Sequence, residues 1–123
     1  MTTYVFDSSA ILAVLYEEKG HEVVAKALRN GGYISAANWS ELAQKTIHTG
    51  AGWDFTRSGL KGLGILVEPV TEHDAEIAAG LWEKGSGLSL ADRLCLALAQ
   101  RLKAEVLTAD SEWKTFPRVT CIR

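Results

Sequence analysis

Residues 94–99, with the sequence Leu-Cys-Leu-Ala-Leu-Ala, form a run without a single polar side chain. The run lies inside residues 89–103, a segment that begins with a helix start signal at Ser89 and is predicted to be helical. A helix that is apolar on most of its circumference needs other parts of the protein to cover it. We therefore expect this helix at the centre of the molecule. The 123 residues suit one domain with a real core, so residues 1–123 are predicted to form a single domain.

Short apolar segments alternate with segments of helical periodicity along the chain. The predicted strands are residues 4–6, 33–36, 65–67, 105–108 and 119–122. The predicted helices are residues 8–20 with a cap at Ser8 or Ser9, residues 21–29, a helix from residue 38, and residues 53–63, 71–82 and 89–103. Strands that alternate with helices favour a mostly parallel sheet. The expected fold class is α/β, a three-layer α/β/α sandwich.

The overall charge of the chain is slightly negative. Its net charge is −2, and its pI is about 5.9. This excludes the strong basic field that marks many nucleic-acid-binding proteins, so a polyanion would have to be attracted by a local site. The composition, 47% hydrophobic and 23% charged with two prolines, is that of a folded globular protein.

Neither the N-terminus nor the cysteines indicate export or zinc binding. The start of the chain lacks a basic segment, and the apolar residues 10–15 are too few to span a bilayer or to form a signal core. We therefore expect a cytoplasmic protein without membrane contact. Cys95 and Cys121 stand alone, with no CxxC motif, so we expect reduced thiols that pack in the core.

Four acidic residues lie where a predicted strand ends or a predicted helix begins: Asp7, Glu41, Asp92 and Asp110. The carboxyl ends of parallel strands open onto one common edge of a sheet, where residues distant in sequence can meet in a ligand crevice. The positions of the four acids therefore predict one shared, strongly anionic site.

Each of these acids also has an ordinary structural interpretation. Glu41 fits a capping box with Asn38, and Asp92 fits one with Ser89. Asp7 suits a helix cap and Asp110 suits a turn. The segment Thr71 to Asp74 shows the same capping pattern and is not assigned to the site, so capping alone does not identify functional acids.

The surroundings of the four acids favour a bound cation. Several carboxylates beside apolar segments raise one another's pKa values unless a cation neutralises them. All the available ligands are hard oxygens, which suit Mg²⁺ or Mn²⁺ better than zinc or copper. Such an ion can activate water for attack at phosphorus and can stabilise the leaving oxygen. The pattern thus predicts metal-dependent chemistry on a phosphate ester.

Four segments of the chain resemble PIN-domain ribonucleases, and among them the VapC toxins of prokaryotic toxin-antitoxin modules. They are residues 5–10 (Val-Phe-Asp-Ser-Ser-Ala), residues 38–41 (Asn-Trp-Ser-Glu), residues 90–99 and residues 107–110 (Leu-Thr-Ala-Asp), the last followed by Trp113. The resemblance covers nearly the whole chain, in the right order.

The resemblance implies an activity and a set of roles. Asp7, Glu41, Asp92 and Asp110 would be the catalytic and metal-binding acids of an endoribonuclease that uses Mg²⁺ or Mn²⁺ and cleaves RNA. Ser9 and Thr108 would support the site, although Ser9 also suits a helix cap and Thr108 a strand end. The family likeness further implies a homodimer, and an antitoxin protein that folds over the groove.

Basic and aromatic side chains near the acids are candidate contact residues. Lys45 and Arg93 could bind RNA phosphates, although each is also explained as ordinary solvated surface. Trp39 and Trp53 could contact the antitoxin, because exposed aromatic anchors often dominate binding. Core packing is the commoner role of tryptophan.

Two other functions agree with an acidic α/β domain. One is a non-enzymatic receiver-like signalling domain with an acidic metal pocket. It fits less well, because residues 67–70 (Val-Glu-Pro-Val) offer no phosphate-accepting Asp after the middle strand. The other is a partner-binding domain in which the acids only cap helices.

Overall fold

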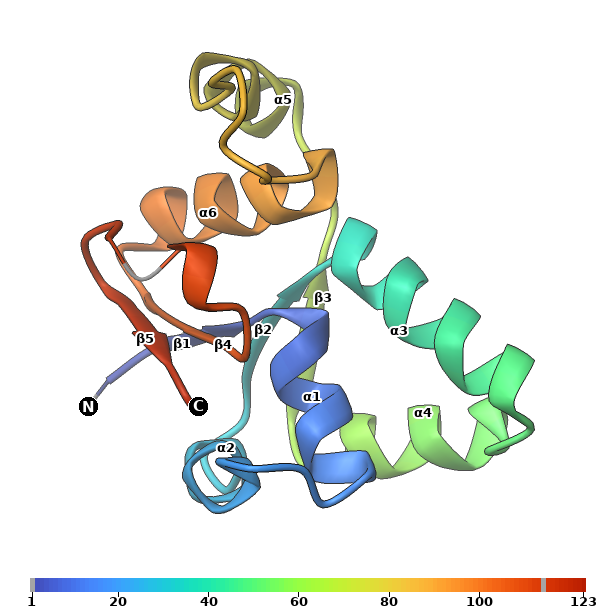
Figure 1. The fold of residues 1–123 in the computed structure, drawn as a ribbon. Coiled ribbons are helices and arrows are strands. Elements are labelled where there is room, and N and C mark those ends of the chain that lie inside the picture. Colours follow the sequence, from blue (N-terminus) through green and yellow to red (C-terminus); the bar gives the residue numbers. More distant parts are fainter. Residues whose placement is uncertain (1, 114) are drawn as a thin grey trace.

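The computed structural model describes residues 2–113 and 115–123, which contain a five-stranded sheet flanked by helices (Figure 1). The strand order is β3-β2-β1-β4-β5, and every neighbouring pair is parallel. The α/β prediction is therefore confirmed, and the described sheet is wholly parallel. The strands are β1 (Tyr4–Phe6), β2 (Gly32–Ser35), β3 (Ile65–Glu68), β4 (Glu105–Thr108) and β5 (Val119–Cys121).

Helices cover both faces of the sheet, which gives the predicted three layers. One face packs against α1, α2, α3 and α4, and the other packs against α6, whose outer side carries α5 (Figure 1). The helices are α1 (Ser8–Leu15), α2 (His21–Leu28), α3 (Ala36–Thr49), α4 (Trp53–Gly62), α5 (Glu72–Gly80) and α6 (Leu90–Leu102), with a short 3₁₀ turn, η1 (Ser111–Trp113).

The strands divide their side chains between two hydrophobic clusters. Phe6 and Leu107 belong to the cluster that contains α1, whereas Val5 and Val106 belong to the cluster that contains α6. Successive side chains of a strand point to opposite faces, so neighbouring residues of β1 and β4 stabilise different layers. Burial of these two strands on both faces fixes their register, and thereby the position of the residues that follow them.

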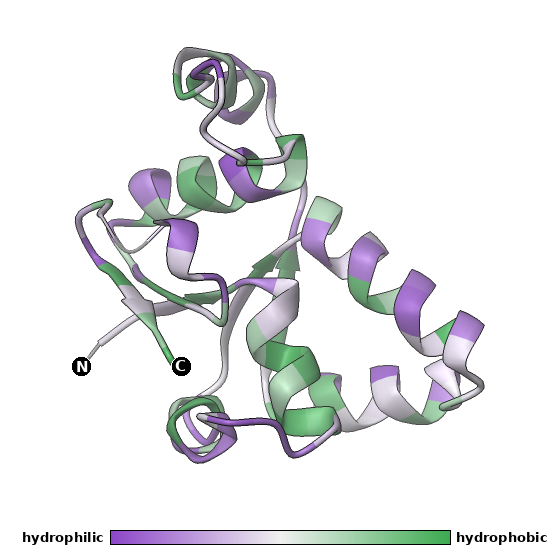
Figure 2. Cartoon of the chain, viewed as in Figure 1, coloured by the Kyte–Doolittle hydropathy of each residue, from purple (hydrophilic) through white to green (hydrophobic). Residues whose placement is uncertain are grey.

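Helix α6 occupies the central position that its apolar run predicts. All six residues from 94 to 99 are buried. The helix contacts α5, α3 and the three strands β1, β2 and β4. Its middle turns are hydrophobic in Figure 2, and its ends are more polar. The rigid placement of α6 also fixes its first turn, which carries Asp92.

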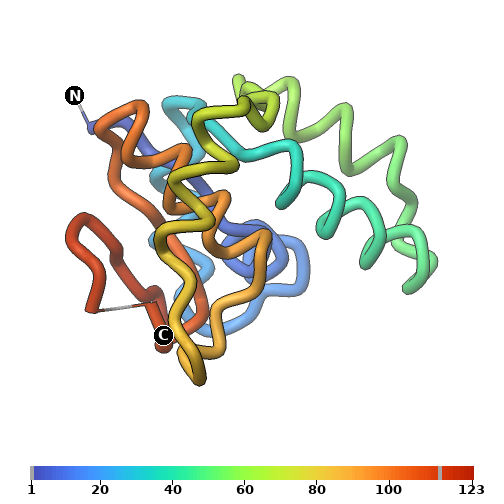
Figure 3. Tube along the Cα trace, turned by 90° about the horizontal axis from the view of Figure 1, so that it is seen from above, coloured from blue at the N-terminus to red at the C-terminus, as the bar shows by residue number. Residues whose placement is uncertain are grey.

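Helices α3 and α4 form an arm that extends from the body of the domain (Figures 1 and 3). Gly50 ends α3 in the left-handed conformation, with φ 75°, and lets the chain reverse into α4. Trp39 and Trp53 pack edge to face across the two helices, with ring centroids 5.0 Å apart. The ammonium of Lys61 lies 5.7 Å from the centre of a Trp39 ring. Aromatic packing therefore joins the two helices of the arm.

Several predicted helix ends differ from the observed ones. Helix α1 ends at Leu15, and the chain then turns through Glu17, whose φ is 53°. Helix α3 begins at Ala36, earlier than predicted, because Ser35 caps it by accepting a hydrogen bond from the Ala37 amide. Helix α5 ends at Gly80, so the exposed Trp82 lies outside it.

Within the described residues, no helix is long and apolar enough to span a bilayer. Both cysteines are free thiols, as expected. Cys95 is fully buried in the cluster around α6, which confirms its packing role.

Asp74 shows what an acid does when it serves only the fold. It completes a capping box with Thr71 at the start of α5, as predicted. Its two oxygens also accept hydrogen bonds from Arg101 Nε and Nη2, at 2.9 and 3.0 Å. Burial would raise the pKa of Asp74, but the hydrogen bonds from Arg101 and Thr71 outweigh it and hold that pKa below its usual value. This bidentate contact ties α5 to α6.

We expect Asp74→Ala to lower the free energy of unfolding by about 2–4 kcal/mol, because it removes a cap and leaves Arg101 without its closest partner. Urea denaturation followed by circular dichroism measures the change. Asp54→Ala is the matched control: Asp54 is an exposed acid in the first turn of α4. It should change the stability by less than about 0.5 kcal/mol. Equal losses in the two variants would contradict the role of the Asp74 contact.

Candidate active site

Asp7 lies at the carboxyl end of β1, the central strand of the sheet, and its side chain is buried. Three side chains from three different elements donate to it. Asn38 Nδ2 on α3 donates to Oδ1 at 3.2 Å. Ser9 on α1 and Thr108 on β4 donate to Oδ2, the latter at 2.9 Å. Asp7 occupies the N-cap position of α1, as predicted, but its side chain makes no capping hydrogen bond.

The buried position of Asp7 is unfavourable for its charge. The pKa of Asp7 is raised to about 6. Burial is the largest cause, the hydrogen bonds from Ser9 and Thr108 act against it, and the negative charges of Asp92 and Glu41 add to it. A cation that binds beside such a carboxyl group favours its ionised form and takes the place of the proton.

Asn38 connects the first acid to the second. Its Nδ2 donates to Asp7 Oδ1 and to Glu41 Oε1, each at 3.2 Å. Glu41 Oε1 also accepts a hydrogen bond from Ser8 Oγ at 3.0 Å. Because α3 begins at Ala36, Glu41 lies in its second turn, and the predicted capping box of Asn38 and Glu41 is wrong. Glu41 is thus released from capping and faces Asp7.

Sequence reasoning missed the roles of Asn38 and Ser8 in the site. Asn38 and Glu41 are three residues apart on one helix, and this spacing places two side chains on the same face. Ser8 follows Asp7 directly in the chain. Both signals were present, but the capping interpretation competed with them, because the start of α3 was placed too late.

Asp92 combines capping with a place in the site. The predicted capping box is confirmed: Asp92 Oδ2 accepts from the Ser89 amide at 2.9 Å, and the Asp92 amide donates to Ser89 Oγ at 3.1 Å. Oδ1 takes no part in this box. Burial raises the pKa of Asp92, the hydrogen bonds from Ser89 lower it, and the charges of Glu41 and Asp110 raise it.

Asp110 follows β4, and it is held by the Thr108 hydroxyl and the Glu112 amide. Its amide donates to Thr108 Oγ1 at 3.0 Å, and its Oδ1 accepts from the Glu112 amide at 2.9 Å. The predicted turn role of Asp110 is therefore confirmed. Ser9 Oγ accepts from the Ala109 amide at 2.9 Å, so Ser9 joins α1 to the end of β4 and does not cap α1.

The four acids share one region of the molecule. Asp7 is affected by the charges of Asp92 and Glu41, and Asp92 by those of Glu41 and Asp110. The thiol of Cys95 lies beneath this region: burial raises its pKa well above the usual value, and the charges of Asp7, Asp92 and Glu41 add to the effect. The structure therefore brings together carboxylates from β1, α3, α6 and the end of β4.

Comparison with known proteins identifies the family. A model of the PIN domain matches residues 4–119. The chain belongs to the PIN domain family. No curated protein matches the sequence of this PIN domain significantly.

Solved structures share the fold of this PIN domain at low sequence identity. A toxin-antitoxin complex from Klebsiella pneumoniae has a TM-score of 0.82 and 20% identity over 98% of each chain. A DNA-bound VapBC structure from Salmonella typhimurium has a TM-score of 0.70 and 18% identity over 100% of each chain. A sarcin-ricin-loop-cleaving VapC toxin from Mycobacterium tuberculosis has a TM-score of 0.69 and 14% identity over 89% of this chain and 91% of that one.

The donor atoms of this PIN domain fit a hard divalent ion. Within residues 2–113 and 115–123, no three His, Cys, Asp or Glu side chains converge tightly enough to form a preformed metal cluster. Mg²⁺, however, usually takes only one or two carboxylates directly and keeps several waters. Asp7 and Glu41 both accept a hydrogen bond from Asn38 Nδ2, so these two carboxylates are neighbours. Asn38 Oδ1 is a buried oxygen without a hydrogen-bond partner in the described structure. These oxygens suit Mg²⁺ or Mn²⁺.

The four candidate contact residues are in different settings. Lys45 is exposed on α3. Arg93 is half-buried, and its Nη1 donates to the Ala78 carbonyl at 2.9 Å. Trp39 and Trp53 are half-buried and pack against the cluster around α1. Lys45 is thus free to approach a ligand, whereas Arg93 and the two tryptophans already contribute to packing.

The pKa of Asp7 predicts a pH dependence of stability. Asp7 binds its proton more tightly in the folded state, at about 6, than its ordinary value of 3.8. The folded state therefore loses stability as the pH rises from about 4 to about 6, and the loss contributed by this one group is about 3 kcal/mol at most. Asp7→Asn should abolish this contribution and be the more stable protein at pH 7.

Urea denaturation in EDTA at several pH values measures this difference between the wild type and Asp7→Asn. Glu72→Gln, an exposed acid at the start of α5, is the control and should follow the wild type. Parallel curves for the wild type and Asp7→Asn would show that Asp7 does not carry the effect.

Proposed function

We propose that this PIN domain is a divalent-metal-dependent endoribonuclease that hydrolyses RNA phosphodiester bonds, and that it is the toxin of a type II toxin-antitoxin pair. The observation that carries the proposal is the buried Asp7, which is fixed by donors from three elements and lies near the charges of Asp92 and Glu41, while Asp110 lies near Asp92. Without a bound cation, this group of acids lowers the stability of the folded protein. Its presence is explained when a cation and a phosphate ester occupy the site.

The side chains of this domain would hold and orient the reaction components. Asp7 is the anchor, since its donors prevent it from rotating. Glu41 lies beside it, and Asp92 and Asp110 extend the anionic surface. Bound Mg²⁺ or Mn²⁺ would supply Lewis acidity to water and to the leaving oxygen. Ser9 and Thr108 would position Asp7 by hydrogen bonds and would not touch the substrate.

The structural comparisons support the toxin assignment. Several chains with this fold come from toxin-antitoxin complexes, and one is described as a sarcin-ricin-loop-cleaving toxin. At identities of 14–20%, these structures support the fold of the chain alone. The proposed activity rests on the acidic site. Lys45 and Arg93 are the proposed RNA phosphate contacts, because both flank the acids on α3 and α6.

We expect Asp7→Asn and Asp92→Asn to lower the RNA cleavage rate by at least about a hundredfold while both variants stay folded. Each substitution removes a carboxylate charge but keeps the shape of the side chain. The measurement is cleavage of a panel of structured and unstructured RNAs with Mg²⁺ or Mn²⁺, with EDTA as the metal-free reference. Asp54→Asn, on the exposed side of α4, is the control and should retain full activity. Full activity of either site variant would refute the assignment.

Calorimetric titration with Mn²⁺ separates the enzyme from a partner-binding domain in which the acids only stabilise helices. The wild type should bind Mn²⁺, and Asp92→Asn should bind it about tenfold more weakly. Equal heats for both proteins would favour the partner-binding alternative, even if no RNA in the panel is cleaved.

The arm formed by α3 and α4 is the proposed antitoxin contact surface. Ile47 is 56% exposed and Phe55 is 85% exposed. Trp39 and Trp53 lie on the same two helices and support the arm from below. Exposed aromatic side chains on a firm base are typical binding anchors. The homodimer that the family resemblance implies is also part of the proposed function.

We expect Phe55→Ala to weaken binding of the cognate antitoxin by at least about tenfold, because an anchor is lost while the core is untouched. Trp39→Ala and Trp53→Ala should also weaken binding, but they should lower stability as well, since both side chains pack against the core. Surface plasmon resonance and thermal unfolding measure the two effects. Leu66→Ala, an exposed residue on β3, is the control. Unchanged binding in all three arm variants would exclude this surface.

A further inference from the structure

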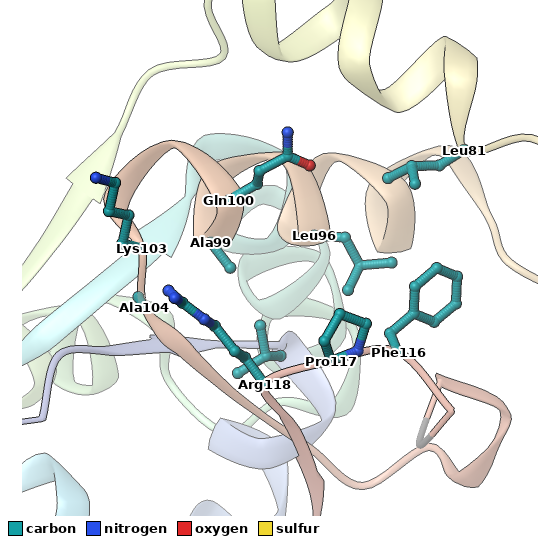
Figure 4. A pocket seen from close by; sticks show the side chains of 10 residues that line it. Leu81, Leu96, Ala99, Gln100, Lys103, Ala104, Phe116, Pro117 and Arg118 are labelled. Atoms are coloured by element: carbon teal, nitrogen blue, oxygen red, sulfur yellow. The ribbon is translucent and has the colours of Figure 1, made fainter.

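A cavity of about 470 Å³ lies between α6 and the segment that leads into β5 (Figure 4). Its walls are mostly apolar and include Leu96 and Ala99 of α6, Val106 of β4 and Phe116. Lys103 and Arg118 also line it. Its volume falls in the range of small-molecule sites, about 300–1,000 Å³.

The cavity is polarised along its length. Figure 4 shows Lys103, Ala104 and Arg118 at one end and Leu81 and Phe116 toward the other. Among the described residues that line the cavity, two are cations and none is acidic. The chain as a whole has 15 acidic and 13 basic residues, so this surface reverses the overall balance. An apolar floor with two cations at one end is complementary to a molecule that is itself apolar and anionic.

Backbone hydrogen bonds hold the chain at both basic residues. Lys103 and Arg118 have left-handed backbone conformations, with φ 53° and 62°, which side chains of this type rarely adopt. The Arg118 carbonyl accepts a hydrogen bond from the Val106 amide at 2.8 Å, and the Lys103 amide donates to the Gln100 carbonyl at 3.3 Å. Lys103 is explained by its place at the C-terminus of α6, where a cation is favourable. Arg118 lies in a loop, and no helix end accounts for it.

We propose that this cavity binds a small amphipathic anion, a molecule with an apolar body and a single carboxylate, sulfonate or phosphate group. The apolar body lies against Leu96, Ala99 and Phe116, and the anionic group lies between Lys103 and Arg118. The site is separate from the acids, because Asp92 is in the first turn of α6 and Lys103 follows its last turn. The proposal therefore does not depend on the nuclease function.

A matched pair of fluorescent probes tests the proposal. 8-Anilinonaphthalene-1-sulfonate has an aromatic body and one sulfonate, whereas N-phenyl-1-naphthylamine has a similar body without the charge. We expect the sulfonate probe to bind the folded protein with one-to-one stoichiometry and to bind more tightly than the neutral probe. In the double variant Lys103→Asn with Arg118→Asn, it should bind about five- to tenfold more weakly, while the neutral probe is unaffected. Asn tolerates the left-handed conformation, so the backbone is preserved.

Three further variants locate the site. Ala99→Trp places a large ring in the cavity, because the Ala99 side chain points into it in Figure 4, and it should block both probes while circular dichroism shows that the protein stays folded. Arg57→Gln with Lys84→Gln removes the same total charge outside the cavity and should leave both affinities unchanged. Asp92→Asn should bind both probes like the wild type, whatever its RNA cleavage.

Three results would overturn the proposal. The first is equal affinity of the two probes, with no effect of the double variant, since the cavity would then lack a preference for anions. The second is concentration-dependent self-association in sedimentation experiments that displaces the probe, since a second copy of the chain would then cover the cavity. The third is displacement of the probe by a short RNA at lower concentration than by free phosphate or acetate, since the surface would then belong to a nucleic-acid site.

Discussion

The burial of the Asp7 carboxylate at the end of the central strand is the constraint on which the rest of this site depends. A carboxylate that is buried away from water needs hydrogen-bond donors from the protein. For Asp7 these are the side chains of Ser9, Asn38 and Thr108. These donors belong to α1, α3 and β4, so satisfying one side chain fixes the relative positions of three elements. Two of these donors also hold other acids of the site: Asn38 donates to Glu41, and Thr108 accepts from the Asp110 amide.

Gathering acids in this place opposes folding. Burial and like charges raise the pKa values of Asp7 and Asp92, so ionisation of these two acids at neutral pH lowers the stability of the folded protein. The two hydrophobic clusters and contacts such as that of Asp74 with Arg101 offset the effect. The stability that a functional site removes is therefore supplied by residues elsewhere, which is common where ligands are bound. A cation that neutralises the acids would remove the opposition.

Three acids with the sequence spacing of capping residues show why local pattern and function are separate. Asp74 and Asp92 both complete capping boxes, yet Asp74 is paired with Arg101 whereas Asp92 lies among other acids. Glu41 has the spacing of a capping residue but lies in the second turn of its helix. A capping box describes a few consecutive residues. The contacts of the carboxylate oxygen that takes no part in the capping box depend on which residues the fold places near it.

The sequence by itself determined the alternation of strands and helices, the burial of residues 94–99 and the positions of Asp7, Asp92 and Asp110 at element ends, whereas it placed Glu41 too close to the start of its helix. These properties depend on side-chain periodicity and on neighbours in the chain. Only the tertiary structure decided that Asn38 joins Asp7 to Glu41, that Ser9 reaches the end of β4, and that Lys103 and Arg118 line one cavity. Such contacts join residues far apart along the chain, and their geometry follows from the order and register of the strands, which no local pattern contains.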